Sequence, residues 1–293
     1  MRTVVSGATG YIGGRLLAAL LQRGWDVCAI VQASDESPLP PGVLRVADPG
    51  SAADLASALD SFGPDAVMHL AACQDLTDTP SVSDALVEAN LAFGSRVLAA
   101  SRNAGARALV AAGTYSTHAS GSEAYAPQTL YAATKQAFTA LAEHYRTNTP
   151  LQTVILELSD TYGPGDARPK FLNLIASAAA TGEILGASPG DQVIRPLHAD
   201  DIVSAFIHAT TLLLAGDKLG PTHSVSGPEA VTLQELVTVF EQATGSAVPV
   251  RWGARPHRPR EIMLPWAGDP LPRWSPGIGL AEGLRSVYGQ PDA

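Results

Sequence analysis

Short apolar runs alternate with longer amphipathic segments through the first two-thirds of this 293-residue chain. The apolar runs predict strands at residues 3–6, 26–31, 66–70, 108–112 and 153–158. Between the first two runs, Leu16, Leu17, Leu20 and Leu21 recur at the spacing of one helix face. This alternation predicts an α/β fold, a Rossmann-type doubly wound parallel sheet whose right-handed crossovers place helices on both faces.

The pattern becomes irregular after about Tyr162, where glycines and prolines interrupt the chain. We therefore predict a dinucleotide-binding domain at residues 1–162 and a smaller α+β substrate lobe at 163–293, from which the chain could return to the first domain. Helices are expected at 170–181, 199–214 and 232–244. The last of them begins with Thr232 three residues before Glu235, a capping-box spacing. Residues 255–274, rich in Pro, Arg and Trp, are expected to form an extended surface loop.

Composition excludes several classes of function. The chain carries 28 acidic and 19 basic residues, a formal charge of −9, and no run of Lys or Arg, so nucleic acid is a poor candidate partner. Cys28 and Cys73 are its two cysteines and lie far from each other and from any metal-ligand spacing, so neither a disulfide nor a metal site is expected. No secretory signal or membrane span is recognisable, and we expect a cytoplasmic protein.

A glycine motif follows the first predicted strand and precedes a helix. It reads Gly7-Ala8-Thr9-Gly10-Tyr11-Ile12-Gly13. Glycines there allow a tight turn and a close approach of backbone to pyrophosphate, which the amides at the helix start then bind. Isolated glycines could serve helix packing alone, but this context predicts a dinucleotide site. The expected contacts are Gly7, Thr9, Gly10, Tyr11, Ile12 and Gly13.

The end of the second predicted strand bears on the choice of nicotinamide cofactor. A carboxylate there would bind the ribose hydroxyls and repel a 2′-phosphate, but the strand runs into Gln32, which we expect to contact the cofactor. NADPH is therefore favoured over NADH. Asp35 and Glu36 follow closely and argue the other way, and no arginine directly follows the strand to pair with a phosphate.

Tyr131 and Lys135 are separated by one helical turn and so project from the same helix face. A neighbouring cation favours the phenolate, which would move the tyrosine pKa from ~10 toward neutrality and suit it to proton transfer. Thr114 follows the strand at 108–112, at the carboxyl edge where ligands bind in such sheets. Its hydroxyl could bond a substrate oxygen or merely stabilise a turn. We predict Thr114, Tyr131 and Lys135 as catalytic residues.

With the glycine motif, Thr114, Tyr131 and Lys135 in this order, nearly the whole chain resembles the extended short-chain dehydrogenase/reductases that modify nucleotide sugars. The resemblance implies further cofactor contacts: a strand-end segment that lines the cofactor, a residue at the adenine, an Asn of the central helix and a residue beside the nicotinamide. In this sequence these are Leu70, Ala71, Ala72, Asp48, Asn90 and Thr161. It also implies a homodimer formed by the helices that carry Asn90 and Tyr131.

Three segments are more specifically similar to CDP-abequose and paratose synthases and to the 4-ketoreductases of antibiotic deoxysugar pathways. They are residues 113–118, 130–138 and 160–170. The resemblance implies reduction by NADPH of the C4 ketone of a dTDP- or CDP-linked 4-keto-6-deoxyhexose. Tyr131 would donate the proton to the developing alkoxide, and Thr114 would polarise the ketone.

The sequence departs from sugar dehydratases of this superfamily. Those enzymes carry Asp-Glu after the active-site Thr, whereas Tyr115-Ser116 follows here, so 4,6-dehydration is disfavoured. Ile194 stands where many relatives place a phosphate-binding Arg, and Arg195 is one residue later. Arg195 is balanced between a phosphate ligand and a surface salt bridge. The substrate contacts we expect are Cys73, Tyr115, Asp160, Arg168, Lys170 and Arg195.

Other interpretations remain open. A C4 epimerase with tightly bound NAD would use the same residues, as would a carbonyl reductase of broad specificity. A non-catalytic NAD(P)-binding sensor is disfavoured because the sequence keeps Thr114, Tyr131 and Lys135. Asp201 is expected to be structural and to fix a helix start. Three arginines of the 255–274 segment could close over the nucleotide, although a solvated loop is favoured: Arg255, Arg258 and Arg260.

Overall fold

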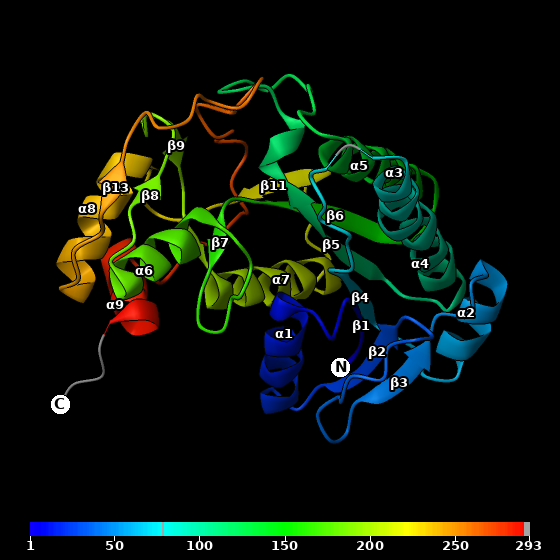
Figure 1. Cartoon of the computed structure of the whole chain (residues 1–293). Coiled ribbons are helices and arrows are strands. Elements are labelled where there is room, and N and C mark those ends of the chain that lie inside the picture. The colour runs from blue at the N-terminus through cyan, green and yellow to red at the C-terminus, as the bar shows by residue number, and fades with distance from the viewer. Residues whose placement is uncertain (78, 290–293) are drawn as a thin grey trace.

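A central sheet of seven parallel strands organises the computed structural model, which describes residues 1–77 and 79–289. The strand order is β11-β6-β5-β4-β1-β2-β3, so the chain reverses direction across the sheet between β1 and β4 (Figure 1). Every neighbouring pair in this sheet is parallel. The strands are β1 (Arg2–Ser6), β2 (Asp26–Val31), β3 (Leu44–Ala47), β4 (Ala66–His69), β5 (Ala108–Thr114), β6 (Gln152–Leu158) and β11 (Thr222–Val225).

The predicted fold class is confirmed, and five of the sheet strands lie where the apolar runs placed them. The two edge strands were missed. In β3 the side chains of Leu44, Arg45 and Ala47 are exposed, so the strand has no continuous apolar run. In β11 the central residues His223 and Ser224 are polar although they are buried. Neither segment therefore carries the apolar run that marks a buried strand.

Helices cover both faces of the sheet. One apolar cluster joins the sheet to Leu16, Leu17 and Leu20 of α1 (Tyr11–Gln22) and to Ile202 and Phe206 of α7 (Ala199–Leu214). The helices of the opposite face are α2 (Ala52–Asp60), α3 (Pro80–Val87), a π-helical turn (Glu88–Ala92), α4 (Phe93–Asn103) and α5 (Leu130–Asn148). Burying one leucine side chain stabilises the fold by roughly 1.5–3 kcal/mol. The two helical layers therefore fix the position of the sheet, including the edge that carries the site.

The second lobe has a separate apolar core. It contains α6 (Phe171–Thr181), α8 (Leu233–Thr244) and α9 (Leu280–Tyr288), which pack around Ile175, Leu236 and Phe240. The predicted capping box is present: Thr232 Oγ1 accepts from Glu235 N, and Thr232 N donates to the Glu235 carboxylate. The short strands are β7 (Thr161–Tyr162), β8 (Leu185–Gly186), β9 (Val193–Ile194), β10 (Leu197–His198), β12 (Val231–Thr232) and β13 (Val250–Arg251).

The chain crosses between the two parts several times. Helix α7 packs against α1 and β5, and β11 pairs with β6, so residues after 163 complete the central sheet before the chain returns to the second lobe. Asp201 is structural, as expected, and its carboxylate binds the backbone just ahead of α9 and does not cap α7. His198 caps α7, whereas the Asp201 carboxylate accepts from Gly277 N and Ile278 N, just before α9.

The segment at 255–274 has no helix, and its single pairing is an isolated bridge at Pro270. It runs along the loop after β5, where Leu264 O accepts from Gly121 N and Trp266 Nε1 donates to Glu123. Trp266 also stacks on the buried ring of His118 at 4.0 Å between centroids. In Figure 1 the segment, in orange, runs from the second lobe to the loop after β5. No helix of the described residues is long and apolar enough to cross a bilayer.

Candidate active site

The glycine loop is tightly packed against the ends of two strands. Gly7 has a φ of 72°, and a Cβ there would lie 2.5 Å from the backbone nitrogen of Ala71. A Cβ on Gly13 would overlap the carbonyl oxygen of Gly7. Gly10 precedes α1 without any side-chain cap, and Gly10 and the first residues of the helix line the cavity. This arrangement suits the pyrophosphate of a dinucleotide.

The contrast between Gly13 and Gly14 gives a matched test of this packing. Gly13→Ala must push the loop apart, which we expect to lower the free energy of unfolding by about 1–3 kcal/mol and to abolish tight dinucleotide binding. A Cβ on Gly14 would meet nothing closer than the Ala8 oxygen at 4.0 Å. Gly14→Ala should therefore stabilise α1 by roughly 0.5–1 kcal/mol. Urea denaturation with and without NAD measures the stability and the NAD binding of both variants. Equal values for the two would contradict the close contact between Gly13 and the Gly7 carbonyl.

Thr114, Tyr131 and Lys135 line one cavity of about 320 Å³ together with the glycine loop. Tyr131 and Lys135 lie in the first two turns of α5, whose start is fixed by Thr129 Oγ1 accepting from Ala132 N at 3.1 Å. Thr114 ends β5 and lines the cavity, and its hydroxyl accepts from Ser116 N, which stabilises the turn; its bond to a substrate oxygen stays a prediction. The remaining lining residues are Leu70, Ala72, Gln74, Ala112, Gly113, Leu158, Ser159, Thr161, Arg168 and Lys170.

Burial dominates the protonation of Tyr131 and Lys135, the predicted catalytic pair. It raises the pKa of Tyr131 to about 12, partly offset by the positive charge of Arg168. It lowers the pKa of Lys135 to about 8. The expected shift of the tyrosine toward neutrality is therefore wrong for this structure, because desolvation of the phenolate outweighs the effect of nearby cations. Tyr131 is a protonated phenol at neutral pH, which is the form that can donate a proton.

The predicted cofactor contacts divide between the cavity and its surroundings. Leu70, Ala72 and Thr161 line the cavity, and Ala71 packs on Gly7. Asp48 instead forms an ion pair with Arg96 at 2.8 Å. These positions are consistent with a dinucleotide lying across the glycine loop toward Tyr131. Nothing in the cavity places Asp48 at an adenine.

Asn90 has a structural set of partners. It is 1% exposed and lies in the π-helical turn between α3 and α4. Its Oδ1 accepts from Cys73 N, and its Nδ2 donates to Cys73 O and to Thr134 Oγ1. Thr134 in turn donates to the carbonyl of Tyr131. Asn90 therefore ties the loop after β4 to the catalytic helix, and no cavity contact is shown for it.

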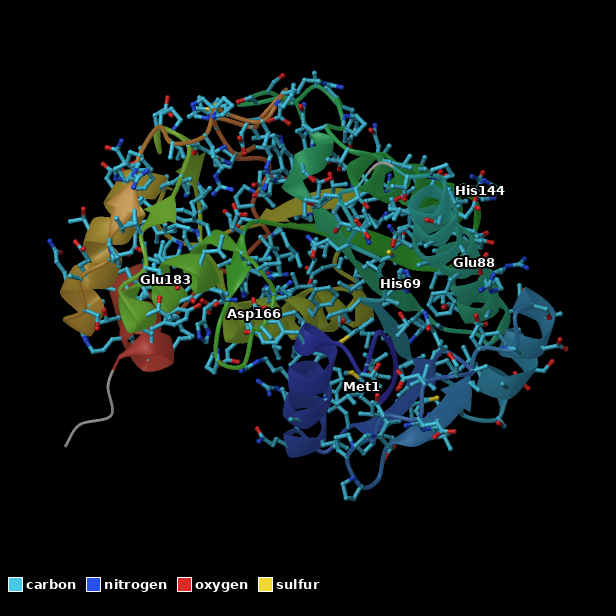
Figure 2. The ribbon with its side chains drawn as sticks, viewed as in Figure 1. Met1, His69, Glu88, His144, Asp166 and Glu183 are labelled. Atoms are coloured by element: carbon cyan, nitrogen blue, oxygen red, sulfur yellow. The ribbon has the colours of Figure 1, made fainter. Side chains whose placement is uncertain are left out.

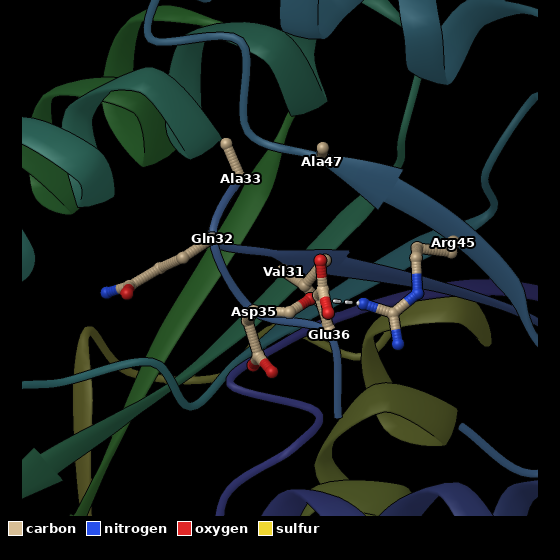
Figure 3. A pocket seen from close by; sticks show the side chains of 7 residues that line it. All are labelled: Val31, Gln32, Ala33, Asp35, Glu36, Arg45 and Ala47. Atoms are coloured by element: carbon tan, nitrogen blue, oxygen red, sulfur yellow. Dashed lines mark hydrogen bonds between the residues drawn. The ribbon is translucent and has the colours of Figure 1, made fainter. Parts of the chain in front are cut away.

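A second recess lies beyond the end of β2. Gln32, Asp35, Glu36 and Arg45 line it, and Arg45 donates to the backbone oxygen of Asp35 while Gln32 points away (Figure 3). The Asp35 carboxylate accepts from Thr9 Oγ1 of the glycine loop at 2.7 Å. Hydrogen bonds from Ser37 and Thr9 lower the pKa of Asp35 to about 2, so it is ionised at neutral pH. The sequence motif did not predict this contact.

The predicted substrate residues fall into four positions. Arg168 and Lys170 line the same cavity as the glycine loop, with Asp166 of their loop beside the start of α1 (Figure 2). Tyr115 donates to Asp160 at 3.0 Å, and burial raises the pKa of both groups. Arg195 is half-buried and has no ion-pair partner within the described ranges. Cys73 is half-buried. It lies near Tyr131, because a thiolate at Cys73 would raise the pKa of the Tyr131 hydroxyl.

The structure adds a buried pair that the sequence analysis did not single out. His118 Nε2 lies 2.8 Å from the Glu157 carboxylate, and its ring is stacked between Tyr125 and Trp266. Glu157 is on β6, so this pair fixes the loop after Thr114 to the sheet and to the C-terminal segment. The partners lie about 40 and 150 residues apart along the chain, and no local pattern joins them.

Comparison with known proteins agrees with this architecture. Residues 3–220 match the NAD dependent epimerase/dehydratase family. CDP-abequose synthase of Yersinia pseudotuberculosis is 24% identical over 90% of this chain and 92% of its own. The 3-diazoavenalumate denitrifying reductase of a Streptomyces species is 31% identical over 71% and 72%.

A solved structure extends the likeness to the whole fold. A mutant UDP-glucuronic acid 4-epimerase from Bacillus cereus, in complex with NAD and a fluorinated UDP-sugar, is 21% identical with a TM-score of 0.84. The match covers 98% of both chains. The cavity has the features that NAD needs: uncapped helix amides, a glycine loop in close contact with β4, and a Tyr-Lys pair. The chain thus belongs to the NAD dependent epimerase/dehydratase family, the extended short-chain dehydrogenase/reductases.

Proposed function

We propose that this enzyme reduces the C4 ketone of a nucleotide-linked (dTDP- or CDP-) 4-keto-6-deoxyhexose. The observation that carries the proposal is that Thr114, Tyr131 and Lys135 line one cavity with the glycine loop. The reaction and the sugar class come from CDP-abequose synthase, which matches this chain along nine-tenths of its length. Arg195 remains a candidate substrate contact, and a homodimer through α5 and the helix of Asn90 remains a prediction.

The protein groups suit a reduction. Bound NAD(P)H would supply a hydride to the carbonyl carbon, while the phenol of Tyr131 donates its proton to the alkoxide that forms. Because its pKa is about 12, Tyr131 is fully protonated before each turnover. The charge of Lys135 stabilises the resulting phenolate until a proton returns from solvent. Thr114 would donate a hydrogen bond to the ketone oxygen, which orients the carbon toward the cofactor.

Dehydration has weaker support. It requires an acid and a base next to Thr114, and the residues there are Tyr115 and Ser116. Tyr115 donates to Asp160, which lies in the bend between β6 and β7, so its hydroxyl is already engaged. Burial raises the pKa of Tyr115 well above 10, which makes it a poor base.

For the cofactor we propose NAD(H) in place of the NADPH that the sequence favoured. The support is the recess at β2, where two carboxylates, Asp35 and Glu36, face one cation, Arg45. Thr9 holds the ionised Asp35 beside the glycine loop, where it would accept from a ribose hydroxyl and repel a 2′-phosphate. Arg45 is committed to backbone oxygens of Asp35 and Ser37.

Asp35→Asn tests the cofactor proposal. Removing the charge should improve the affinity for NADPH at least about tenfold and change that for NADH little. Glu36→Gln, whose side chain has no contact to Thr9, serves as the matched control. Fluorescence titration of both reduced cofactors gives the ratio. A wild-type enzyme that already prefers NADPH would contradict the proposal.

A C4 epimerase is the second candidate, because the Bacillus cereus epimerase shares the fold across the chain and contains NAD. Cofactor stoichiometry separates the two functions. Purified protein is mixed with NADH or NADPH and a freshly generated 4-keto-6-deoxyhexose nucleotide, and absorbance of the reduced nicotinamide is followed. Oxidation with one reduced sugar formed per cofactor supports the reductase. Interconversion of two sugar nucleotides with NAD retained would assign the epimerase, and binding of NAD(P) without either reaction would leave the sensor.

A further inference from the structure

Positively charged side chains surround the first residue of α1. The guanidinium of Arg168 lies 4.9 Å from the centre of the Tyr11 ring, and that of Arg15 lies 5.4 Å from it. The Tyr11 hydroxyl is buried and has no hydrogen-bond partner within residues 1–77 and 79–289. Tyr11 is also part of the glycine motif, so this charge lies at the start of the helix whose first residues line the cavity.

Two of the cations converge on one uncharged atom. Arg168 Nη2 and Lys170 Nζ both donate to Thr161 Oγ1, at 2.9 and 2.8 Å. Asp166 neutralises Arg168 through two hydrogen bonds, whereas Lys170 has no ion pair among the described residues. Burial lowers the pKa of Lys170 and the charge of Arg168 lowers it further, while the charges of Asp160 and Asp166 raise it. Holding two cations this close is unfavourable, and an anion bound next to them would offset the repulsion.

The loop that carries these cations is fixed in place. Gly163 approaches Tyr11 so closely that a Cβ would lie 2.6 Å from the tyrosine hydroxyl. Asn173 Nδ2 donates to the backbone oxygens of Asp166 and Arg168. The cations are thus held against α1 before any ligand binds, which reduces the entropy lost on binding.

We propose that Arg168 and Lys170 form a clamp for the pyrophosphate of the dinucleotide cofactor, not for the diphosphate of the substrate. Both residues share their cavity with Gly7, Gly10, Tyr11, Ile12 and Gly13, the residues that present amides to a dinucleotide. The inference rests on the dinucleotide site of the proposed function and is independent of which sugar is reduced.

The test measures binding and needs no turnover. ADP-ribose carries the pyrophosphate of the cofactor without the nicotinamide, and CDP or dTDP represents the substrate diphosphate. Isothermal titration of Arg168→Gln and Lys170→Gln should show ADP-ribose binding weakened at least about tenfold in each variant, as expected when a charged hydrogen bond is lost. Binding of CDP and dTDP should remain unchanged.

Controls separate this inference from other failures. Arg15→Gln removes the other guanidinium near Tyr11, which pairs with Asp200, donates to Pro164 O and does not line the cavity, and should leave ADP-ribose affinity within about twofold. Thermal melts verify that each variant folds. Two results would overturn the proposed clamp. One is a lower affinity for CDP or dTDP while the affinity for ADP-ribose is unchanged, and the other is an equal loss of affinity for ADP-ribose and for the nucleoside diphosphates. A failed ketoreductase assay would leave these binding results unaffected.

Discussion

Tyr131→Phe is expected to lower the rate of ketone reduction by about 10²–10⁴-fold, the usual contribution of a positioned proton donor. The substitution removes one oxygen atom from a side chain that is 9% exposed and leaves its ring packing intact. Because the hydroxyl has a pKa of about 12, the wild-type group donates its proton throughout the neutral range. Single-turnover absorbance changes with NADH or NADPH measure the loss directly.

The control for this experiment lies on the same helix. Tyr145 is 14 residues downstream in α5 and does not line the cavity. Tyr145→Phe should keep full activity. ADP-ribose affinity should be the same in both variants, since neither hydroxyl is needed for the pyrophosphate. A Tyr131→Phe enzyme with normal turnover would rule out Tyr131 as the proton donor.

Lys135→Met is expected to abolish activity while making the protein more stable. The ammonium group is 3% exposed, and burial lowers its pKa from 10.5 to about 8. That difference corresponds to about 3 kcal/mol of unfavourable free energy in the folded state at neutral pH. Methionine has a similar shape and helix propensity and needs no charge. Urea denaturation at pH 7 should therefore show a gain of up to about 3 kcal/mol.

The stability difference between the wild-type protein and Lys135→Met should change with pH. Between pH 8 and 10.5 the unfolded chain binds the lysine proton and the folded chain does not, so wild-type stability rises with pH relative to the variant. The advantage of Lys135→Met should disappear near pH 10.5. The exposed Lys218, changed to Met, should alter stability by less than about 0.5 kcal/mol at any pH. A destabilised Lys135→Met protein would show that the ammonium group has a structural partner.

The sequence predicted those features that depend on neighbours along the chain. Five strands were found because their apolar residues are consecutive. Tyr131 and Lys135 were paired because one helical turn separates them, and the glycine loop because strand, glycines and helix follow each other directly. The cavity gathers these segments at the carboxyl ends of the strands, as the parallel sheet requires.

Contacts between distant segments could not be predicted in this way. Asp35 reaches Thr9 across 26 residues, and Asn90 reaches Thr134 across 44. Arg168 looked like a substrate ligand because its loop follows the nicotinamide segment, but its contact with Tyr11 depends on how that loop returns to α1. The tyrosine pKa was misjudged for a related reason: the spacing to Lys135 is visible in the sequence, but the depth of burial is not.

The return of α7 and β11 to the central sheet has a consequence for synthesis of the chain. Phe206 and Ile202 cover the same sheet face as Leu16 and Leu20, yet they follow some 180 residues later. While the ribosome is still making the second half, that face stays exposed, and a fragment ending near residue 162 would present it to solvent permanently. The nucleotide-binding half therefore cannot finish folding before residue 225 leaves the ribosome. Until then, chaperones can bind the exposed apolar sheet face.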